Sequence, residues 1–277
     1  MSDLELRAAA VAPRPGGLRV ADLLAGVFVS ALLVAAVFPG VAPYDPLAID
    51  PGAAFQGPTA AHLFGTDESG RDLLSRVIAG AGASLLIGVA ATAIGLGLGT
   101  ILGLIAALGG RVADAVVARI LEVFFSFPGL LLALLVIVVT GPGVIPATVA
   151  VGLSTAPGYA RILRGQLLGI RSAGYVEAAR VLGHGPWRIL LRHILPNTFA
   201  PLTVLATLGI GQAIVWAAAL SYLGLGAEPP APEWGAMLSA GRTYIGSAWW
   251  MTVFPGLVIV LTTIATTVLG RRLRGTR

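Results

Sequence analysis

Long uninterrupted apolar stretches constrain this chain more than any other feature of its sequence. Only 11% of the residues are charged, whereas 56% are hydrophobic. A soluble domain carries about 25% charged residues, so this chain has too few charges to cover a water-exposed surface. Roughly 20 apolar residues cross the hydrocarbon core of a bilayer, and the stretches near that length are 20–38, 78–108, 113–140, 144–163, 201–222 and 247–269. The predicted fold class is an all-α polytopic membrane protein with six transmembrane helices.

The first apolar stretch could also be the core of a cleaved signal peptide. The polar head that precedes it is 19 residues long and contains Asp3 and Glu5, which favours a retained span. We expect a cytoplasmic tail (1–19), a first transmembrane helix (20–38) and an extracytoplasmic segment with an interfacial helix (39–77). These are followed by a core of five transmembrane helices (78–270), which includes one basic cytoplasmic loop (161–197), and by a second tail (271–277).

The arginines predict the orientation of these spans. All 18 basic residues are arginines, and with the N-terminus inside, 15 of them fall on the inner side. The outer side holds Arg71, Arg76 and Arg242. Because basic residues concentrate in cytoplasmic loops, both termini are predicted to be cytoplasmic, with an even number of spans. The high pI of 10.4 is then a property of one membrane face, and nucleic acid is not an expected partner.

Several kinds of chemistry are excluded or disfavoured by missing residues. A phosphate-binding loop of the GxxxxGK[ST] type needs a lysine, and the chain has none. His62, His184 and His193 show no metal-ligand spacing, and the chain has no cysteine. We therefore expect no metal, no cofactor and no catalytic residue in this chain, and any ATP and magnesium would belong to a partner protein.

The most informative segment is the basic loop 161–197. Ser172 could cap a helix over about 173–182, and Gly183 suits its end. Arg180 would lie in the last turn, where a cation complements the helix dipole. Pro186 fits the first position of a second helix, which Pro196 would end. Its predicted apolar face consists of Trp187, Leu190, Leu191, Ile194 and Leu195.

Two interpretations of this loop stay open on physical grounds. An amphipathic basic helix at a membrane surface can be a simple anchor. Two short helices joined by glycine and proline could instead form a rigid element, so that a force applied to it moves the attached spans.

The sequence of this loop resembles the EAA loop of ABC importer permeases, through EAARVLG (177–183) followed by RHILPN (192–197). More narrowly, most of the chain is similar to the second permease subunit of the dipeptide/oligopeptide family. The other matching segments are APYDP (42–46), LFGTDESGRDLLSRV (63–77), FPGLLLAL (127–134), ALSYLGLG (219–226) and FPGLVIVLT (254–262). His193 replaces the isoleucine of the general pattern, and the C-terminal RRLRGTR lacks the family's usual acidic tail.

The resemblance implies a type I ABC importer permease fold in a bacterial cytoplasmic membrane. It implies a coupling helix in a groove of a partner ATPase, with its contacts at Glu177, Ala178, Ala179, Arg180 and Gly183. Small alanines at 178 and 179 would allow close approach. The implied partners are a second homologous permease in a heterodimer, two ATP-binding subunits and an extracytoplasmic solute-binding protein. The implied cargo is a dipeptide or oligopeptide, with nickel chelate, haem or glutathione as alternatives.

The outer segments offer candidate contacts for a binding protein or a gate at Asp67, Arg71 and Trp234. Thr66 is expected to cap a short interfacial helix, with Asp67 and Arg71 paired at i, i+4. In the third span, Glu122 is expected to pair with Arg119 three residues earlier. Gly95, Gly99 and Gly103 form small-xxx-small steps that allow close helix packing.

Two other classes of function compete with the permease subunit. An ion-coupled secondary transporter needs ionisable residues near mid-membrane, and the predicted spans offer almost none. A channel or membrane scaffold would not depend on an ATPase.

Overall fold

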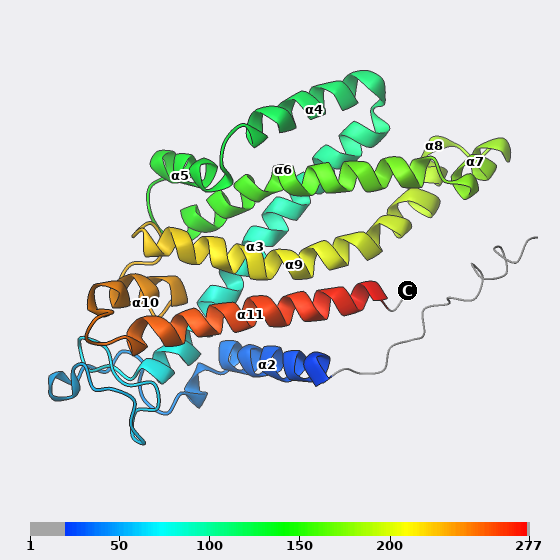
Figure 1. Cartoon of the computed structure of the whole chain (residues 1–277). Coiled ribbons are helices and arrows are strands. Elements are labelled where there is room, and N and C mark those ends of the chain that lie inside the picture. The colour runs from blue at the N-terminus through cyan, green and yellow to red at the C-terminus, as the bar shows by residue number, and fades with distance from the viewer. Residues whose placement is uncertain (1–19, 276–277) are drawn as a thin grey trace, which may run out of the picture.

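The computed structural model describes residues 20–275, and this part of the chain is a bundle of long helices. Four of them run lengthwise through the bundle together with α6 (Figure 1). These four are α2 (Val20–Val37), α3 (Leu73–Leu108), α9 (Leu195–Tyr222) and α11 (Trp250–Gly275). Each is long and apolar enough to cross a bilayer, with α9 taken together with the turns that lead into it from Pro186.

The third crossing along the chain is broken in the middle. α4 (Gly110–Phe125) and α5 (Gly129–Thr140) are together apolar enough for one span, but they meet at an angle of 88°. Pro128 stands at the break and caps α5 with an extended backbone, because proline and the residue before it disfavour a continuing helix. The predicted span 113–140, which contains Pro128, is therefore bent, and we call it the α4–α5 elbow.

The sixth member of the bundle, α6 (Val144–Arg171), is less apolar than the others. Its 28 residues span about 42 Å at 1.5 Å per residue, which exceeds the bilayer core. It packs mainly on α3 and also on α5, α9 and α4. A helix that is covered by protein on several sides can carry polar residues at membrane depth. The six predicted crossings thus correspond to α2, α3, the elbow, α6, α9 and α11.

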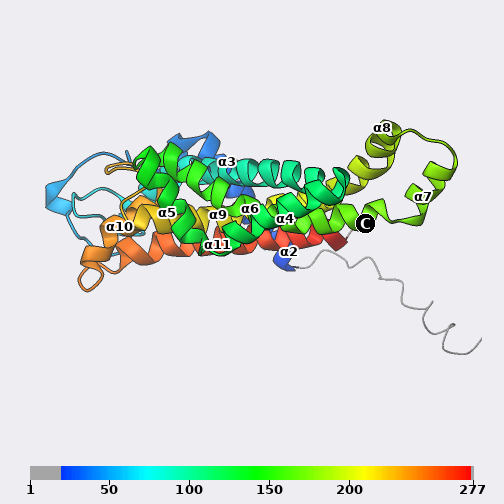
Figure 2. The ribbon, with the colours of Figure 1, turned by 90° about the horizontal axis from the view of Figure 1, so that it is seen from above.

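The two ends of the bundle differ. The α10 helix (Trp234–Gly241) and residues 38–72 gather at one end, which we call the loop end, while α7 (Gly174–Val181) and α8 (Pro186–Ile189) project from the opposite, hairpin end (Figures 1 and 2). Asp22 at the start of α2 pairs with Arg272 near the end of α11, with 3.5 Å between Oδ2 and Nη1. The described chain therefore begins and ends at the same end of the bundle, as an even number of crossings requires. The predicted tail 1–19 lies outside the described residues.

Glycines let α3 and α6 approach so closely that their backbones nearly touch. A Cβ atom placed on Gly99 would lie 2.9 Å from the backbone nitrogen of Ala160, and one on Gly95 would lie 2.9 Å from the carbonyl oxygen of Gly152. Gly103 also faces α6, at Leu163. This confirms that the predicted glycine steps serve helix packing, and it identifies α6 as the partner.

Two predicted boundaries in the segment before α3 are wrong. Residues 63–72 form turns rather than an interfacial helix, and α3 begins at Leu73, five residues before the predicted span. Thr66 does not cap a helix, because its hydroxyl donates to the carbonyl of Ala53 and accepts from the amide of Gln56. The N-cap is Asp72, whose Oδ2 accepts from the backbone nitrogen of Ser75 at 2.8 Å. Glycine at 65 and 70, both with positive φ, turns the chain here instead.

The close contact between α3 and α6 predicts a position-specific effect of bulky residues. Gly99→Leu should lower the free energy of unfolding by about 1–3 kcal/mol, because the clash is with backbone atoms that cannot rotate away. Gly97→Leu is the matched control, since a Cβ at Gly97 meets nothing within 4 Å and the gain in helix propensity is the same. Thermal unfolding of both variants in detergent measures the difference. Equal stability of the two would contradict the packing described here.

Candidate functional site

The α7–α8 hairpin, residues 172–194, joins the end of α6 to the start of α9 and stands clear of the bundle (Figure 2). The face of the hairpin that packs on the bundle is apolar and buried. Val176 and Ala179 of α7 are fully or almost fully buried against Leu167 of α6 and against Ile189 and Ile194. Arg171 fastens the base, since its Nη1 donates to the carbonyl of Ala107 at the end of α3, at 2.6 Å. The hairpin is therefore packed on both α3 and α6.

Gly183 ends α7 in the way that the sequence predicts. Its φ is +78°, a left-handed conformation that glycine adopts without strain. The amide of Gly183 donates to the carbonyl of Arg180, and the amide of His184 donates to that of Ala179. These two bonds form a Schellman motif. At the other end of α7 the prediction is wrong, because Ser172 does not cap the helix and its hydroxyl donates back to Gly169.

The connection from the hairpin to α9 is continuous, so the predicted break at Pro196 is also wrong. Residues Leu190–Ile194 form a π-helical turn, and Pro196 then occupies the first turn of α9. The amide of Leu195 donates to the carbonyl of Leu190, five residues back. This wide turn accommodates a proline that has no N–H to donate. The hairpin is thus joined to α9 without a break in the helical backbone.

The outward face of the hairpin contains most of the predicted coupling residues. Glu177, Ala178, Arg180 and Gly183 are exposed. Ala179 is only 3% exposed, so it packs inside the chain and cannot contact a partner as predicted. Apolar side chains share the exposed face, namely Tyr175, Val181, Leu182, Trp187 and Leu191. Of the predicted apolar face, Trp187 and Leu191 are exposed, whereas Ile194 is buried against the chain together with Ile189, which was not predicted to belong to that face.

A buried ionic network holds the loop end together. Asp67 lies between Arg71 and Arg76, with its Oδ2 at 3.6 Å from Arg71 Nη1 and 3.5 Å from Arg76 Nε. Its other oxygen accepts from the backbone nitrogens of Ser69 and Arg71, at 2.8 and 2.9 Å. The predicted pairing of Asp67 with Arg71 is confirmed, although the two residues lie in a turn. With these partners Asp67 is buried, and it leaves little surface for an external protein.

Arg76 connects three segments that are far apart in the sequence. Besides facing Asp67, its guanidinium donates to the carbonyls of Pro46 and Pro230, at 3.3 and 3.2 Å. The neighbouring Asp72 accepts from Ser75 and contacts His62 Nδ1 at 2.9 Å. The start of α3 thus organises both outer loops.

Trp234 belongs to the same framework. Its side chain is fully buried, and its Nε1 donates to the carbonyl of Val77 at 2.9 Å. Glu233 caps α10 by accepting from the amides of Gly235 and Ala236, and Ser84 of α3 bonds to both Glu233 and Trp234. A tryptophan with no exposed surface cannot bind another protein. The structure therefore places Trp234 in the core of the loop end and not in a contact surface.

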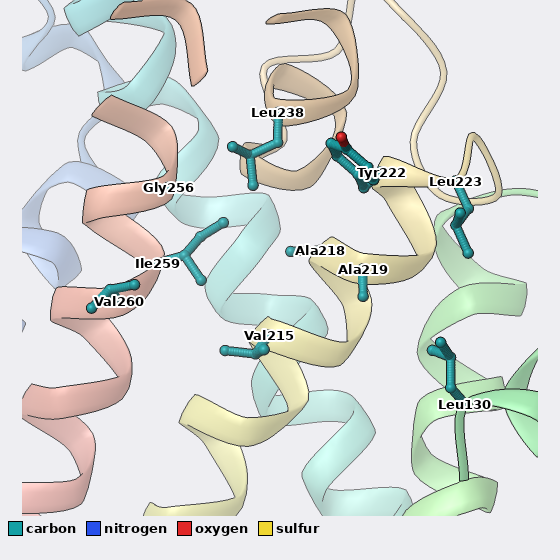
Figure 3. A pocket seen from close by; sticks show the side chains of 10 residues that line it. All are labelled: Leu130, Val215, Ala218, Ala219, Tyr222, Leu223, Leu238, Gly256, Ile259 and Val260. Carbon is teal, nitrogen blue, oxygen red and sulfur yellow. The ribbon is translucent and has the colours of Figure 1, made fainter. Parts of the chain in front are cut away.

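Two hollows lie along α9. The first, of about 470 Å³, is an apolar groove between α9, α10, α11 and Leu130 of α5 (Figure 3). The hydroxyl of Tyr222 is its only side-chain polar group. The second, of about 320 Å³, lies between the α4–α5 elbow, α6 and α9, and it carries Gln212, Ser154 and Thr155 among aromatic rings. Only the second has the mixed lining that is typical of sites for polar solutes.

Sequence reasoning missed the residues whose partners are distant in the chain. Arg76 was counted only as an outer charge, and neither Asp72 nor Glu233 was singled out as a cap. The ion pair between Asp114 and Arg164, 50 residues apart, carried no sequence signal. In contrast, the local pair of Arg119 and Glu122 is confirmed, with 2.7 Å between Nη1 and Oε2. Within residues 20–275 no group of three or more histidines and acids could hold a metal ion.

Comparisons with known proteins agree with this architecture. Residues 99–275 match the family described as binding-protein-dependent transport system inner membrane component. The probable D,D-dipeptide transport system permease protein DdpC of Escherichia coli K12 is 43% identical over 90% of this chain and 83% of its own length. The di/tripeptide transport system permease protein DppC of Pseudomonas aeruginosa is 42% identical over 90% of this chain and 84% of its own.

Solved structures share the fold at lower identity. An inward-facing MetNI methionine ABC transporter matches 73% of this chain and 96% of the solved chain, with a TM-score of 0.59 and 24% identity. An amino acid ABC transporter with histidines covers 71% of this chain and 91% of its own, with a TM-score of 0.57 and 18% identity.

The bundle, the hairpin and these matches define a membrane permease of the type I ABC importer fold. The chain belongs to the family of inner membrane components of binding-protein-dependent transport systems.

The ionic network at the loop end predicts a large effect of losing one arginine. Arg76→Met should lower the free energy of unfolding by about 3–5 kcal/mol, because it leaves the buried carboxylate of Asp67 short of a partner. Arg119→Met is the control, since the exposed pair with Glu122 is worth at most about 1 kcal/mol. Chemical denaturation in detergent, followed by tryptophan fluorescence, compares the two. A similar small loss in both variants would contradict a structural role for Arg76.

Proposed function

We propose that this chain is the transmembrane subunit through which an ATP-driven importer moves small peptides into the cell. The names of the relatives support a peptide cargo, since those that are 43% and 42% identical are permeases for D,D-dipeptides and for di- and tripeptides. Both matches extend over 90% of this chain.

The observation that carries this proposal is the construction of the α7–α8 hairpin. Its inner face is packed on α3 and α6, its end runs without a break into α9, and its outer face exposes five large apolar side chains among charged ones. An exposed apolar patch of this kind marks a site for another protein. We infer that an ATPase subunit binds there, with Glu177 and Ala178 at the contact, so that closure of the ATPases moves α6 and α9.

Energy must come from outside this chain in this scheme. Without a lysine the chain has no P-loop, so ATP and magnesium are assigned to two ATP-binding subunits. A second homologous permease would complete the pathway, and an extracytoplasmic binding protein would deliver the solute. ATP binding then supplies the differential free energy that shifts the bundle between inward-open and outward-open states.

The arginine distribution supports the orientation that we propose. The span assignment made from the sequence puts 15 of the 18 arginines on one side, and in the described residues the hairpin, the start of α2 and the end of α11 share one end of the bundle (Figure 1). Because basic residues concentrate on the cytoplasmic side, this end faces the cytoplasm and the loop end faces the binding protein.

Glutathione is the second candidate cargo. The glutathione transport system permease protein GsiD of Escherichia coli O6:K15:H31 is 44% identical over 91% of this chain, which is as similar as the dipeptide relatives. Glutathione is itself a modified tripeptide, so the same machinery would serve. Uptake assays with each solute separate the two.

If the hairpin couples ATP hydrolysis to transport, uptake should depend more on its backbone conformation than on the identity of its side chains. Gly183→Val forces a branched side chain into a left-handed conformation, a strain of about 1–2 kcal/mol, and should reduce ATP-driven uptake by roughly tenfold, as 1.4 kcal/mol corresponds to tenfold in an equilibrium. Gly185→Val is the control, because Gly185 has a φ of −66° and open space at its Cβ. The measurement is peptide uptake by the full complex in proteoliposomes.

A complex with Gly183→Val that assembles and transports like the control would count against coupling through the hairpin. Uptake by the purified chain without ATPase subunits would instead indicate a secondary transporter or a channel.

A further inference from the structure

The second hollow along α9 has features that the coupling scheme does not use. Five aromatic rings line it: Phe124, Phe125 and Phe127 come from the elbow, Tyr159 comes from α6, and Trp216 comes from α9. Gly129 makes room for this wall, because a Cβ there would lie 2.3 Å from the Trp216 ring. We call this space the elbow hollow. At about 320 Å³ it falls at the lower end of the range for small-molecule sites, about 300–1,000 Å³.

Gln212 places an uncommitted amide in this hollow. It is the eighteenth residue of the 28-residue α9, and its side chain is exposed. No described residue forms a hydrogen bond with it. Of the three hydroxyls that line the hollow, those of Ser154 and Thr155 are committed, since both donate to the carbonyl of Val151 in their own helix. An amide in a membrane-spanning helix needs a polar partner, so the Gln212 side chain must meet water, another chain or a solute.

Arg161 adds a positive charge beside the hollow. Its guanidinium lies 3.6 Å from the centroid of the Phe125 ring, which also lines the hollow. The neighbouring Arg164 and Arg119 have carboxylate partners in Asp114 and Glu122. Arg161 has none among residues 20–275. The Arg161 side chain is exposed, so its positive charge can attract an anionic group of a solute that enters the hollow.

We propose that the elbow hollow is a transient binding site for the peptide during its passage, a proposal that rests on the function proposed above. A glutamine amide both donates and accepts, so Gln212 matches the C=O and N–H of a peptide bond. The aromatic rings accept side chains of varied size, and Arg161 attracts the terminal carboxylate. No group in the hollow selects a particular side chain, which suits a permease that takes its selectivity from a binding protein.

Gly158 makes the hollow testable without breaking the fold. It lines the hollow, and a Cβ there meets nothing within 4 Å. Gly158→Leu should therefore fill the space while improving helix propensity. Gly165 offers the matched control on the same helix, because its Cβ also meets nothing and it does not line the hollow.

The experiment uses the full complex in proteoliposomes, with the binding protein loaded with dialanine. We expect Gly158→Leu to lower dialanine uptake by roughly tenfold, while ATP hydrolysis stimulated by the binding protein stays within about twofold of wild type. Gln212→Leu should lower uptake by about fivefold, as expected for one lost hydrogen bond. Gly165→Leu and Val215→Leu, the latter in the apolar groove of Figure 3, should leave uptake within about twofold of wild type.

Three results would overturn the proposal. Wild-type uptake by both Gly158→Leu and Gln212→Leu would show that no peptide passes through the hollow. Loss of complex assembly in both would show that the hollow is filled by another subunit. A wild-type complex that takes up no dialanine and no glutathione, whatever the variants do, would instead refute the proposed function on which the site depends.

Discussion

The close contact between α3 and α6 is the constraint on which the rest of the structure depends. In a bilayer, helices gain little from burying apolar surface against each other, so small residues that allow close van der Waals packing decide which helices associate. Gly95, Gly99 and Gly103 on α3 meet a complementary face of α6 that includes Gly152. This contact is by far the most extensive between any two helices of the described chain. It fixes the two elements that carry the functional features.

Each end of this helix pair holds a different part of the structure in place. At the loop end, α3 carries Asp72, Arg76 and Ser84, which hold both outer loops and α10. At the hairpin end, α6 leads into α7, and Arg171 ties that junction to the last turn of α3. Between the two ends, α6 and α9 form walls of the elbow hollow. A rotation of the α3–α6 pair would therefore change both ends and the hollow together.

The sequence predicts this fold well where the signal is local. Span positions follow from apolar length, Gly183 from its place after an amphipathic turn, and the even number of crossings from the arginines. The errors arise where another local turn or a distant contact overrides the local rule that was applied. A π turn absorbs Pro196, glycine turns replace the helix expected at 66–71, and Trp234 is held inside by Val77, 157 residues away. Gln212 and Arg161 can be recognised only from the structure. Among the described residues, the Gln212 amide has no hydrogen-bond partner and Arg161 has no carboxylate partner.

The account depends on the hairpin and the loop end facing opposite sides of the membrane, and cysteine accessibility measures this directly. The chain has no cysteine, so Glu177→Cys and Ala60→Cys each introduce one thiol at an exposed position. A membrane-impermeant maleimide applied to spheroplasts should label the thiol at position 60 and should not label the thiol at position 177. Inverted membrane vesicles should give the reverse result. Labelling of position 177 from the outside would contradict the account.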